Sequence, residues 1–261
     1  MAQYDGKFEK YEDFQKIIAT LYSQKKTELV EISTEEKKQS THKLYNLAEL
    51  QKKANTMYGF TADETLNYLQ SFYESGYVSY PRTDSQFLNE AMESDVENII
   101  EVIDSIYAFG IDFKKYIIVS KNKSFNDSKV TDHHAIIPLK KTPVFSQLKE
   151  KEKKVYLLIL ISFLKAFSIP KISDFTLCVF SVKNINEKFL TRGNLIKEPG
   201  FSIFDDILKK QNATALEDEE VNEEFSKIPS LEQGKIYLIN DIVQYEGMTQ
   251  APPLLTDASL I

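Results

Sequence analysis

The chain has 261 residues, 42% of them hydrophobic and 27% charged, which allows one or two globular domains and excludes a disordered or collagen-like chain. Its single cysteine, Cys178, excludes a disulfide framework and a cysteine-rich zinc site. The net charge of −7, from 32 basic and 39 acidic side chains, argues against nucleic-acid binding, but only as an average over the chain.

The N-terminal part predicts a helix followed by a strand. Between residues 8 and 25, apolar side chains recur every three or four positions, as in an amphipathic helix. Residues 27–33 alternate between apolar and polar side chains, as in a strand. The first residues lack the apolar core of a signal peptide, and no apolar run reaches about 18 residues, so we expect a cytoplasmic protein without a membrane partner.

Two helices with capping signals follow. Asn46 with Glu49 opens a helix that we expect to run to about Tyr58. Residues Thr61 and Glu64 open a second one, and the glycine at position 76 lies where a C′ glycine would end it. Further along, an acidic segment at 87–107 and an apolar segment at 147–167 predict two more helices, and residues 117–120 predict a short strand.

From residue 171 onwards, alternating runs separated by turn residues predict a strand-rich half. The runs are 175–182, 188–196 and 235–245, and a helix with an acidic loop interrupts them at 204–224. The fold class that we predict is a multidomain α and β protein, with an α-helical domain at 41–170 inserted into a split β-domain.

The charged residues form blocks. Residues 217–224 hold six acids, residues 84–112 hold eight acids without a Lys or Arg, and residues 113–165 hold twelve Lys and four acids. The simpler interpretation is that these blocks are solvated helix faces. The functional alternative is a basic surface for phosphates, separated from an acidic flank.

The densest group of chemically capable residues is Tyr80-Pro81-Arg82-Thr83-Asp84-Ser85. Proline favours an extended backbone before it, where residues two apart share a face, so Tyr80 and Arg82 should point the same way. A guanidinium beside a phenol favours the phenolate and can hold a phosphate, which suits a tyrosyl nucleophile attacking a phosphodiester. Local chemistry by itself favours a simpler role, a tyrosine packed at a helix–loop junction.

Two adjacent histidines, His133 and His134, lie in loop-like sequence shortly after Lys129. Neighbours on an extended chain point in opposite directions, and no Cys or carboxylate cluster completes a site, so metal binding is not expected. A phosphate contact or proton transfer and a structural hydrogen bond both stay open as their role. Neither a P-loop nor a glycine-rich nucleotide fingerprint occurs, so a nucleotide partner is not expected.

Three ordered motifs resemble the type IA DNA topoisomerases, and within them the bacterial topoisomerase III branch. The first is LYNLAELQKKANTMYGFTADETLNYLQSFYESGYVSYPRTDS at 44–85, and the second is DHHAIIPL at 132–139. The third comprises TQAPP at 249–253 and TDASLI at 256–261. The resemblance runs from about Leu29 to the end of the chain.

This resemblance implies a role for each matching residue. Tyr80 is expected to form a transient 5′-phosphotyrosyl link to one DNA strand, and Arg82 to steady the scissile phosphate. His133 is expected to support the site, and His134 is the weaker candidate; Arg82, both histidines and Lys129 are expected to contact DNA. Two transesterifications conserve bond energy, so DNA topology would change without ATP.

The resemblance also implies a domain organisation. Residues 41–170 resemble the tyrosine-bearing domain, residues 1–40 and 171–248 the two parts of a β-rich arch, and residues 249–261 the start of a C-terminal helical domain. Mg²⁺ is expected in the full enzyme through a Toprim domain, whose motifs this sequence lacks. We therefore expect an internal fragment that is monomeric, holds no cofactor, binds mainly single-stranded DNA and is inactive alone.

A function of another class stays open at this point. A non-catalytic single-stranded DNA-binding or assembly module would use the basic surface of residues 113–165, and its salt-dependent binding would survive the loss of Tyr80. A domain without any nucleic-acid role would show no binding of single strands even at low salt.

Overall fold

The computed structural model describes residues 1–6, 8, 10–107, 109–212, 228–245, 247 and 255–260. These residues form two compact units. The strand unit comprises residues 1–38, 172–198 and the described residues between 228 and 247, and the helical unit comprises residues 39–171, 199–212 and 255–260. The acidic loop at 217–224 and the TQAPP motif at 249–253 lie outside the described residues.

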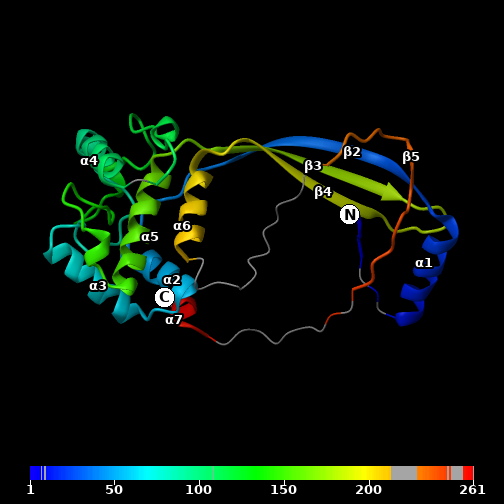
Figure 1. Cartoon of the computed structure of the whole chain (residues 1–261), viewed down its shortest axis with the longest axis horizontal. Helices are drawn as coiled ribbons and strands as arrows, with labels where there is room; N and C mark the ends of the chain where they lie inside the picture. The colour runs from blue at the N-terminus through cyan, green and yellow to red at the C-terminus, as the bar shows by residue number, and fades with distance from the viewer. Residues whose placement is uncertain are drawn as a thin grey trace. The chain divides into compact units, whose positions relative to one another are not determined.

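The strand unit is built on one sheet with the strand order β1-β4-β3-β2-β5 (Figure 1). Its elements are β1 (Gln3–Tyr4), α1 (Tyr11–Gln24), β2 (Lys26–Gln39), β3 (Lys171–Ser181), β4 (Phe189–Glu198) and β5 (Ile236–Leu238). Strands β3 and β4 are antiparallel with Cys178 opposite Thr191, and β2 and β5 are antiparallel with Thr27 opposite Tyr237. The predicted mixture of helices and strands is confirmed, although the last predicted strand is reduced to three residues.

Two small apolar clusters stabilise the strand unit. Leu29, Cys178 and Phe180 are buried together on the sheet. On α1, Leu21 packs against Val182 and Ile185. Burial raises the pKa of the Cys178 thiol, so this cysteine acts as a small apolar core residue rather than a nucleophile.

Strand β2 continues well beyond residue 33, where the alternation of its sequence ends. Its charged second half contacts β3 and β4: Lys37 Nζ lies 4.0 Å from the centre of the Phe175 ring. In addition, Lys197 pairs with Glu36 and with Asp174. Residues 35–38 have the composition of a polar connector, and cross-strand contacts rather than local propensity make them extended.

The helical unit surrounds one apolar helix. Its α-helices are α2 (Leu47–Tyr58), α3 (Ala62–Glu74), α4 (Glu93–Ile106), α5 (Glu150–Ala166), α6 (Asp205–Asn212) and α7 (Asp257–Leu260). Its 3₁₀ helices are η1 (Glu90–Met92), η2 (Lys114–Tyr116), η3 (Asp127–Lys129), η4 (Phe145–Gln147) and η5 (Gly200–Phe204). Every residue from Val155 to Ala166 is buried, and α5 contacts α2, α3, α6 and η5 (Figure 1). A helix that is apolar on all sides has to be buried, which confirms the helix predicted at 147–167 as the core of this unit.

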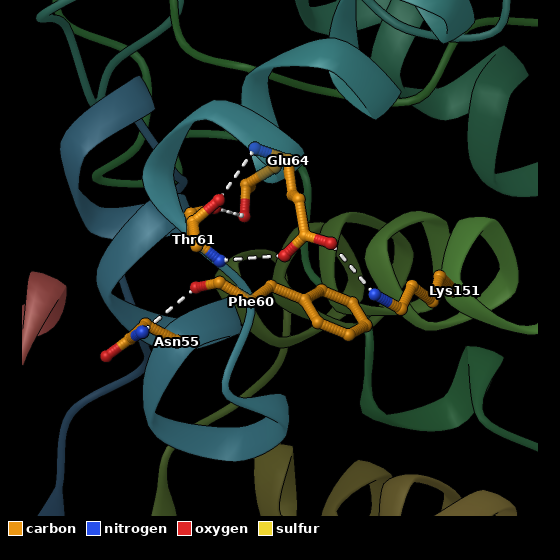
Figure 2. A network of polar contacts seen from close by, with 6 residues as sticks. Asn55, Phe60, Thr61, Glu64 and Lys151 are labelled. Atoms are coloured by element: carbon orange, nitrogen blue, oxygen red, sulfur yellow. Dashed lines mark hydrogen bonds and ion pairs between the residues drawn. The ribbon is translucent and has the colours of Figure 1, made fainter.

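The capping box predicted at Thr61 and Glu64 is confirmed, whereas the one predicted at Asn46 and Glu49 forms only the hydrogen bond to the Asn46 side chain. The Asn46 side chain accepts a hydrogen bond of 2.9 Å from the Glu49 backbone N–H at the start of α2. At the start of α3, Thr61 and Glu64 exchange both hydrogen bonds of a capping box (Figure 2). The Glu64 carboxylate also accepts a hydrogen bond of 2.8 Å from Lys151 Nζ, so the residue that starts α3 also ties it to α5.

Three segments of the helical unit differ from the prediction. The helix predicted from residue 87 begins only at Glu90, as the 3₁₀ helix η1 that runs into α4 at Glu93, because the Leu88 N–H donates to the Ser124 carbonyl and Asn89 is extended. The strand predicted at 117–120 is wrong, since this segment makes only an isolated bridge between Ile117 and Ser168. The segment 200–212, which the sequence placed within the strand-rich half, packs in the helical unit through the fully buried Phe204.

Candidate active site

The tyrosine segment, residues 79–85, alternates between buried and outward-facing side chains. Ser79, Pro81, Thr83 and Ser85 are buried, whereas Tyr80 is half-buried and the side chains at 82 and 84 are exposed. The backbone bends at Pro81 and Arg82, and Tyr80 and Arg82 occupy two of the more exposed positions of this segment.

Three hydroxyl groups attach the buried side of the segment to one loop, residues 129–137. Ser79 Oγ donates to the Ala135 carbonyl at 3.0 Å and accepts from the Ile137 N–H at 2.9 Å. Thr83 Oγ1 donates to the His133 carbonyl at 2.9 Å, and Ser85 Oγ donates to the Lys129 carbonyl at 3.0 Å. Sequence reasoning did not name Ser79 and gave Thr83 and Ser85 no such role, although hydroxyl side chains at alternate positions of the segment were a visible signal.

The start of α2 holds the same segment from another direction. The Leu47 N–H donates to the Thr83 carbonyl, and Asn46 Nδ2 donates to the Asp84 carbonyl, both at 3.1 Å. The Asn46 side chain therefore caps α2 with its oxygen and holds the tyrosine segment with its nitrogen.

The loop at 129–137 brings one histidine to the tyrosine. The rings of Tyr80 and His133 have centres 4.1 Å apart and planes inclined by 37°. His134 instead places Nδ1 2.8 Å from the Ala135 carbonyl oxygen and is half-buried. Of the two predicted histidines, His133 is thus the one in ring contact with Tyr80.

The side chain of Lys129 is exposed, and its Nζ lies 4.8 Å from the centre of the Phe87 ring. Its main-chain carbonyl binds Ser85, so the residue is attached to the tyrosine segment through the backbone. Its ammonium group lies over the ring of Phe87, two residues beyond the end of this segment.

Three other tyrosines of the helical unit have hydroxyls that burial keeps neutral. Burial raises the pKa of Tyr45, Tyr107 and Tyr156, so their hydroxyls stay neutral and are poor nucleophiles. The Tyr107 hydroxyl donates to the Pro143 carbonyl at 3.1 Å. Tyr80 is half-buried beside the ring of His133, which suits a side chain that must reach a substrate.

The basic and acidic blocks are not separated as the functional alternative required. Lys114 pairs with Glu101 at 2.7 Å and with Asp104 at 3.8 Å, and Lys140 pairs with Asp95 at 2.9 Å. The acidic helix α4 thereby neutralises part of the basic segment at 113–165. Lys114 and Lys140 are two of the twelve lysines in this segment.

No cluster of three or more His, Cys, Asp or Glu side chains that could hold a metal ion occurs within the described ranges. In that same part of the chain, none of the helices combines the length and the apolar character needed to cross a bilayer.

Comparison with known proteins extends these observations. A family model described as DNA topoisomerase matches residues 2–261. The chain is 34% identical over 244 residues to DNA topoisomerase 3 of Bacillus cereus, an alignment that covers 89% of this chain and 31% of the relative. It is 31% identical over 240 residues to DNA topoisomerase 3 of Bacillus subtilis, covering 91% of this chain and 32% of that one. The chain thus spans about a third of the length of these curated relatives.

A solved structure has a similar fold. Full-length topoisomerase I from Thermotoga maritima superposes with a TM-score of 0.64 at 20% sequence identity, covering 91% of this chain and 36% of that one.

Proposed function

The chain belongs to the type IA DNA topoisomerase family, and from this premise we propose that its helical unit carries the strand-cleaving tyrosine of such an enzyme. In this proposal the phenolic oxygen of Tyr80 bonds to the phosphorus of one DNA strand, and the 3′-oxygen of the neighbouring nucleotide leaves. The phenol loses a proton and the leaving oxygen gains one. Attack by the resulting 3′-hydroxyl reverses the step and rejoins the strand, so no ATP is consumed.

The observation that carries this proposal is the arrangement of the tyrosine segment. Its buried hydroxyls bind the loop at 129–137, and Tyr80 and Arg82 occupy two of its more exposed positions. A nucleophile held on such a rigid backbone loses little freedom when the substrate arrives.

The neighbouring side chains suit a phosphodiester substrate. The exposed guanidinium of Arg82 can hold phosphate oxygens bidentately and offset the charge that builds up on them. The His133 ring beside Tyr80 supports the phenol, and Lys129 and His134 contribute to DNA contact near the segment. We propose DNA, mainly single-stranded, as the substrate of a monomeric chain that acts in the cytoplasm.

The domain roles are part of the same proposal. We assign the strand unit to the β-rich arch of the family, the helical unit to its tyrosine-bearing domain, and the segment from 249 onwards to the start of a further helical domain. The family resemblance implies Mg²⁺ bound by a Toprim domain. The described residues do not fit a resident Mg²⁺ ion, and each step above uses only this chain's own residues.

A covalent-trapping experiment tests the proposal. The chain spans about a third of the length of its relatives, and we propose that it is inactive alone. In the experiment it is therefore combined with the metal-binding domain of a DNA topoisomerase 3. A 3′-end-labelled single-stranded oligonucleotide should become attached to the protein after denaturation, since the 5′-phosphate stays on the tyrosine. Tyr80→Phe should abolish the attachment, while Tyr22→Phe on α1 should leave it unchanged. Labelled adduct formed by the Tyr80→Phe variant would refute the assignment.

A further inference from the structure

The Tyr80 ring contacts a second aromatic side chain, which comes from α3. The rings of Tyr73 and Tyr80 have centres 5.4 Å apart and planes inclined by 86°, an edge-to-face arrangement. His133 contacts the Tyr80 ring from the loop at 129–137. The phenol is therefore in contact with one ring from a helix and one from a loop.

Hydrogen bonds at the C-terminal end of α3 fix the backbone of Tyr73. Gly76 has φ +72°, its N–H donates to the Tyr73 carbonyl at 2.9 Å, and the Tyr77 N–H donates to the Phe72 carbonyl at 2.8 Å. These two bonds form a Schellman motif, which confirms Gly76 as the predicted C′ residue. Lys141 Nζ donates to the Ser75 carbonyl at 2.9 Å, so the C-cap residue of α3 also has a hydrogen-bond partner.

Adjacent residues of this helix end have different roles. Phe72 is 3% exposed and packs against the core residue Tyr156, with ring centres 5.5 Å apart. Tyr73 is 40% exposed and faces Tyr80 instead. Core packing therefore accounts for the aromatic side chain at 72, whereas the one at 73 has its ring contact with the candidate nucleophile.

An edge-to-face contact restricts the rotation of the ring that it touches. A tyrosine whose backbone is fixed can still swing its hydroxyl through several ångströms by changing χ1, because the staggered rotamers direct the ring differently. Misplacing a reacting atom by about 1 Å can slow a reaction by about 100-fold. A ring that holds one rotamer of Tyr80 would thus raise the rate of strand cleavage without touching the DNA.

We propose that Tyr73 is a positioning residue that holds the Tyr80 ring in one rotamer for attack on the phosphodiester, an inference that rests on the proposed function. Its ring edge supplies the contact, and the Schellman motif at the end of α3 fixes that ring relative to the tyrosine segment. The hydroxyl of Tyr73 has no part in this role.

Two measurements on the same variants test this inference. The first is the χ1 rotamer of Tyr80 in the full chain, from side-chain coupling constants measured by NMR with labelled tyrosine. Tyr73→Ala should average the rotamers of Tyr80, whereas Tyr73→Phe, which keeps the ring, should retain one rotamer. Tyr22→Ala is the matched control, because Tyr22 is an exposed tyrosine (54%) in the last turn of α1.

The second measurement is the rate of covalent adduct formation, in the reaction with the added metal-binding domain, compared with the affinity for uncleaved single-stranded DNA. Tyr73→Ala should slow adduct formation by about 10- to 100-fold and change the dissociation constant less than about twofold, and Tyr73→Phe should restore the rate. Unfolding curves check that the alanine variant is folded.

Three results would overturn the inference. Tyr80 could keep a single rotamer in Tyr73→Ala, or the rate of adduct formation could stay unchanged although the rotamers are averaged. An equal loss of that rate and of the affinity for DNA would instead make Tyr73 a DNA contact. If the unsubstituted protein forms no adduct, or Tyr80→Phe still forms one, the proposed function fails instead. The rotamer measurement then still decides whether Tyr73 constrains Tyr80.

Discussion

The hydroxyl of Thr83 donates a hydrogen bond of 2.9 Å to the main-chain carbonyl of His133, which lies 50 residues further along the chain. The ring of that histidine has its centre 4.1 Å from the centre of the Tyr80 ring. The same Thr83 oxygen accepts the Ser85 N–H at 3.1 Å. A single buried hydroxyl therefore joins the tyrosine segment to the loop that carries the histidine.

Replacing Thr83 with valine should remove the hydrogen bond that joins the tyrosine segment to the loop at 129–137 and so destabilise the protein. The substitution keeps the shape of the side chain but leaves the buried Ser85 N–H and the His133 carbonyl without this partner. Leaving buried groups unpaired costs about 1–3 kcal/mol, so we expect the free energy of unfolding in urea to fall by that amount. Thr56→Val is the control, because Thr56 is exposed and donates only to Lys52 within α2. Equal effects of the two substitutions would argue against a special role for Thr83.

Removing the guanidinium of Arg82 should affect the reaction and not the fold. Arg82 is exposed, so Arg82→Ala should change the free energy of unfolding by less than about 0.5 kcal/mol. Loss of one charged donor to the phosphate should slow adduct formation by about 100-fold. Arg82→Lys should recover part of the rate, because an ammonium keeps the charge but not the bidentate geometry. The exposed Arg192 on β4, the other arginine of the chain, provides the control, and an equal loss in Arg192→Ala would contradict the prediction.

The capping box of α3 should depend on pH in a defined direction. The hydrogen bond from Lys151 and the backbone hydrogen bond from Thr61 lower the pKa of the Glu64 carboxyl. A lowered folded-state pKa means that ionised Glu64 stabilises the fold above its unfolded pKa of about 4.3, and that this contribution is lost as the pH falls through the folded value.

Two measurements follow from this pH dependence. NMR titration of the carboxyl carbon should give Glu64 a pKa below the ordinary range, and Lys151→Met should raise it. The acid side of the Tm–pH curve should be less steep in Glu64→Gln. Lys16→Met, which removes the ion pair with Asp13 on α1, should leave the pKa of Glu64 unchanged.

Replacing either of two glycines with positive φ by alanine should destabilise the protein, but by different amounts. Gly76 has φ +72°, and an added Cβ would lie 3.9 Å from its nearest neighbour, the Lys141 side chain. Gly76→Ala should therefore cost about 1 kcal/mol, through backbone strain alone. At Gly200, with φ +50°, a Cβ would lie 2.4 Å from the Pro170 carbonyl oxygen. Gly200→Ala should cost clearly more, because backbone atoms would also have to move.

Urea unfolding of the two variants, with Gly247→Ala as the control, measures this order. A Cβ at Gly247 would meet nothing within 4 Å, and its φ lies outside the positive range. A larger loss of stability in Gly76→Ala than in Gly200→Ala would contradict the prediction.

Short-range features of the protein were determined by the sequence itself. The capping pairs at Asn46 and Thr61, the helix end at Gly76 and the buried helix α5 all follow from residues a few positions apart. The extended conformation that Pro81 favours at Tyr80 is likewise a local property, because proline restricts the residue before it. Hydrogen bonds and side-chain periodicity over such distances depend little on the rest of the chain.

Only the tertiary structure decided what surrounds Tyr80. The loop at 129–137 meets the tyrosine segment through hydroxyl–carbonyl bonds between residues 44 to 56 positions apart, and it brings the ring of His133 against Tyr80. The pairing of Lys114 and Lys140 with α4, and the packing of Phe204 in the helical unit, likewise join distant segments. Such contacts form only when the apolar core has brought the segments together, because loop closure costs entropy that no local pattern repays.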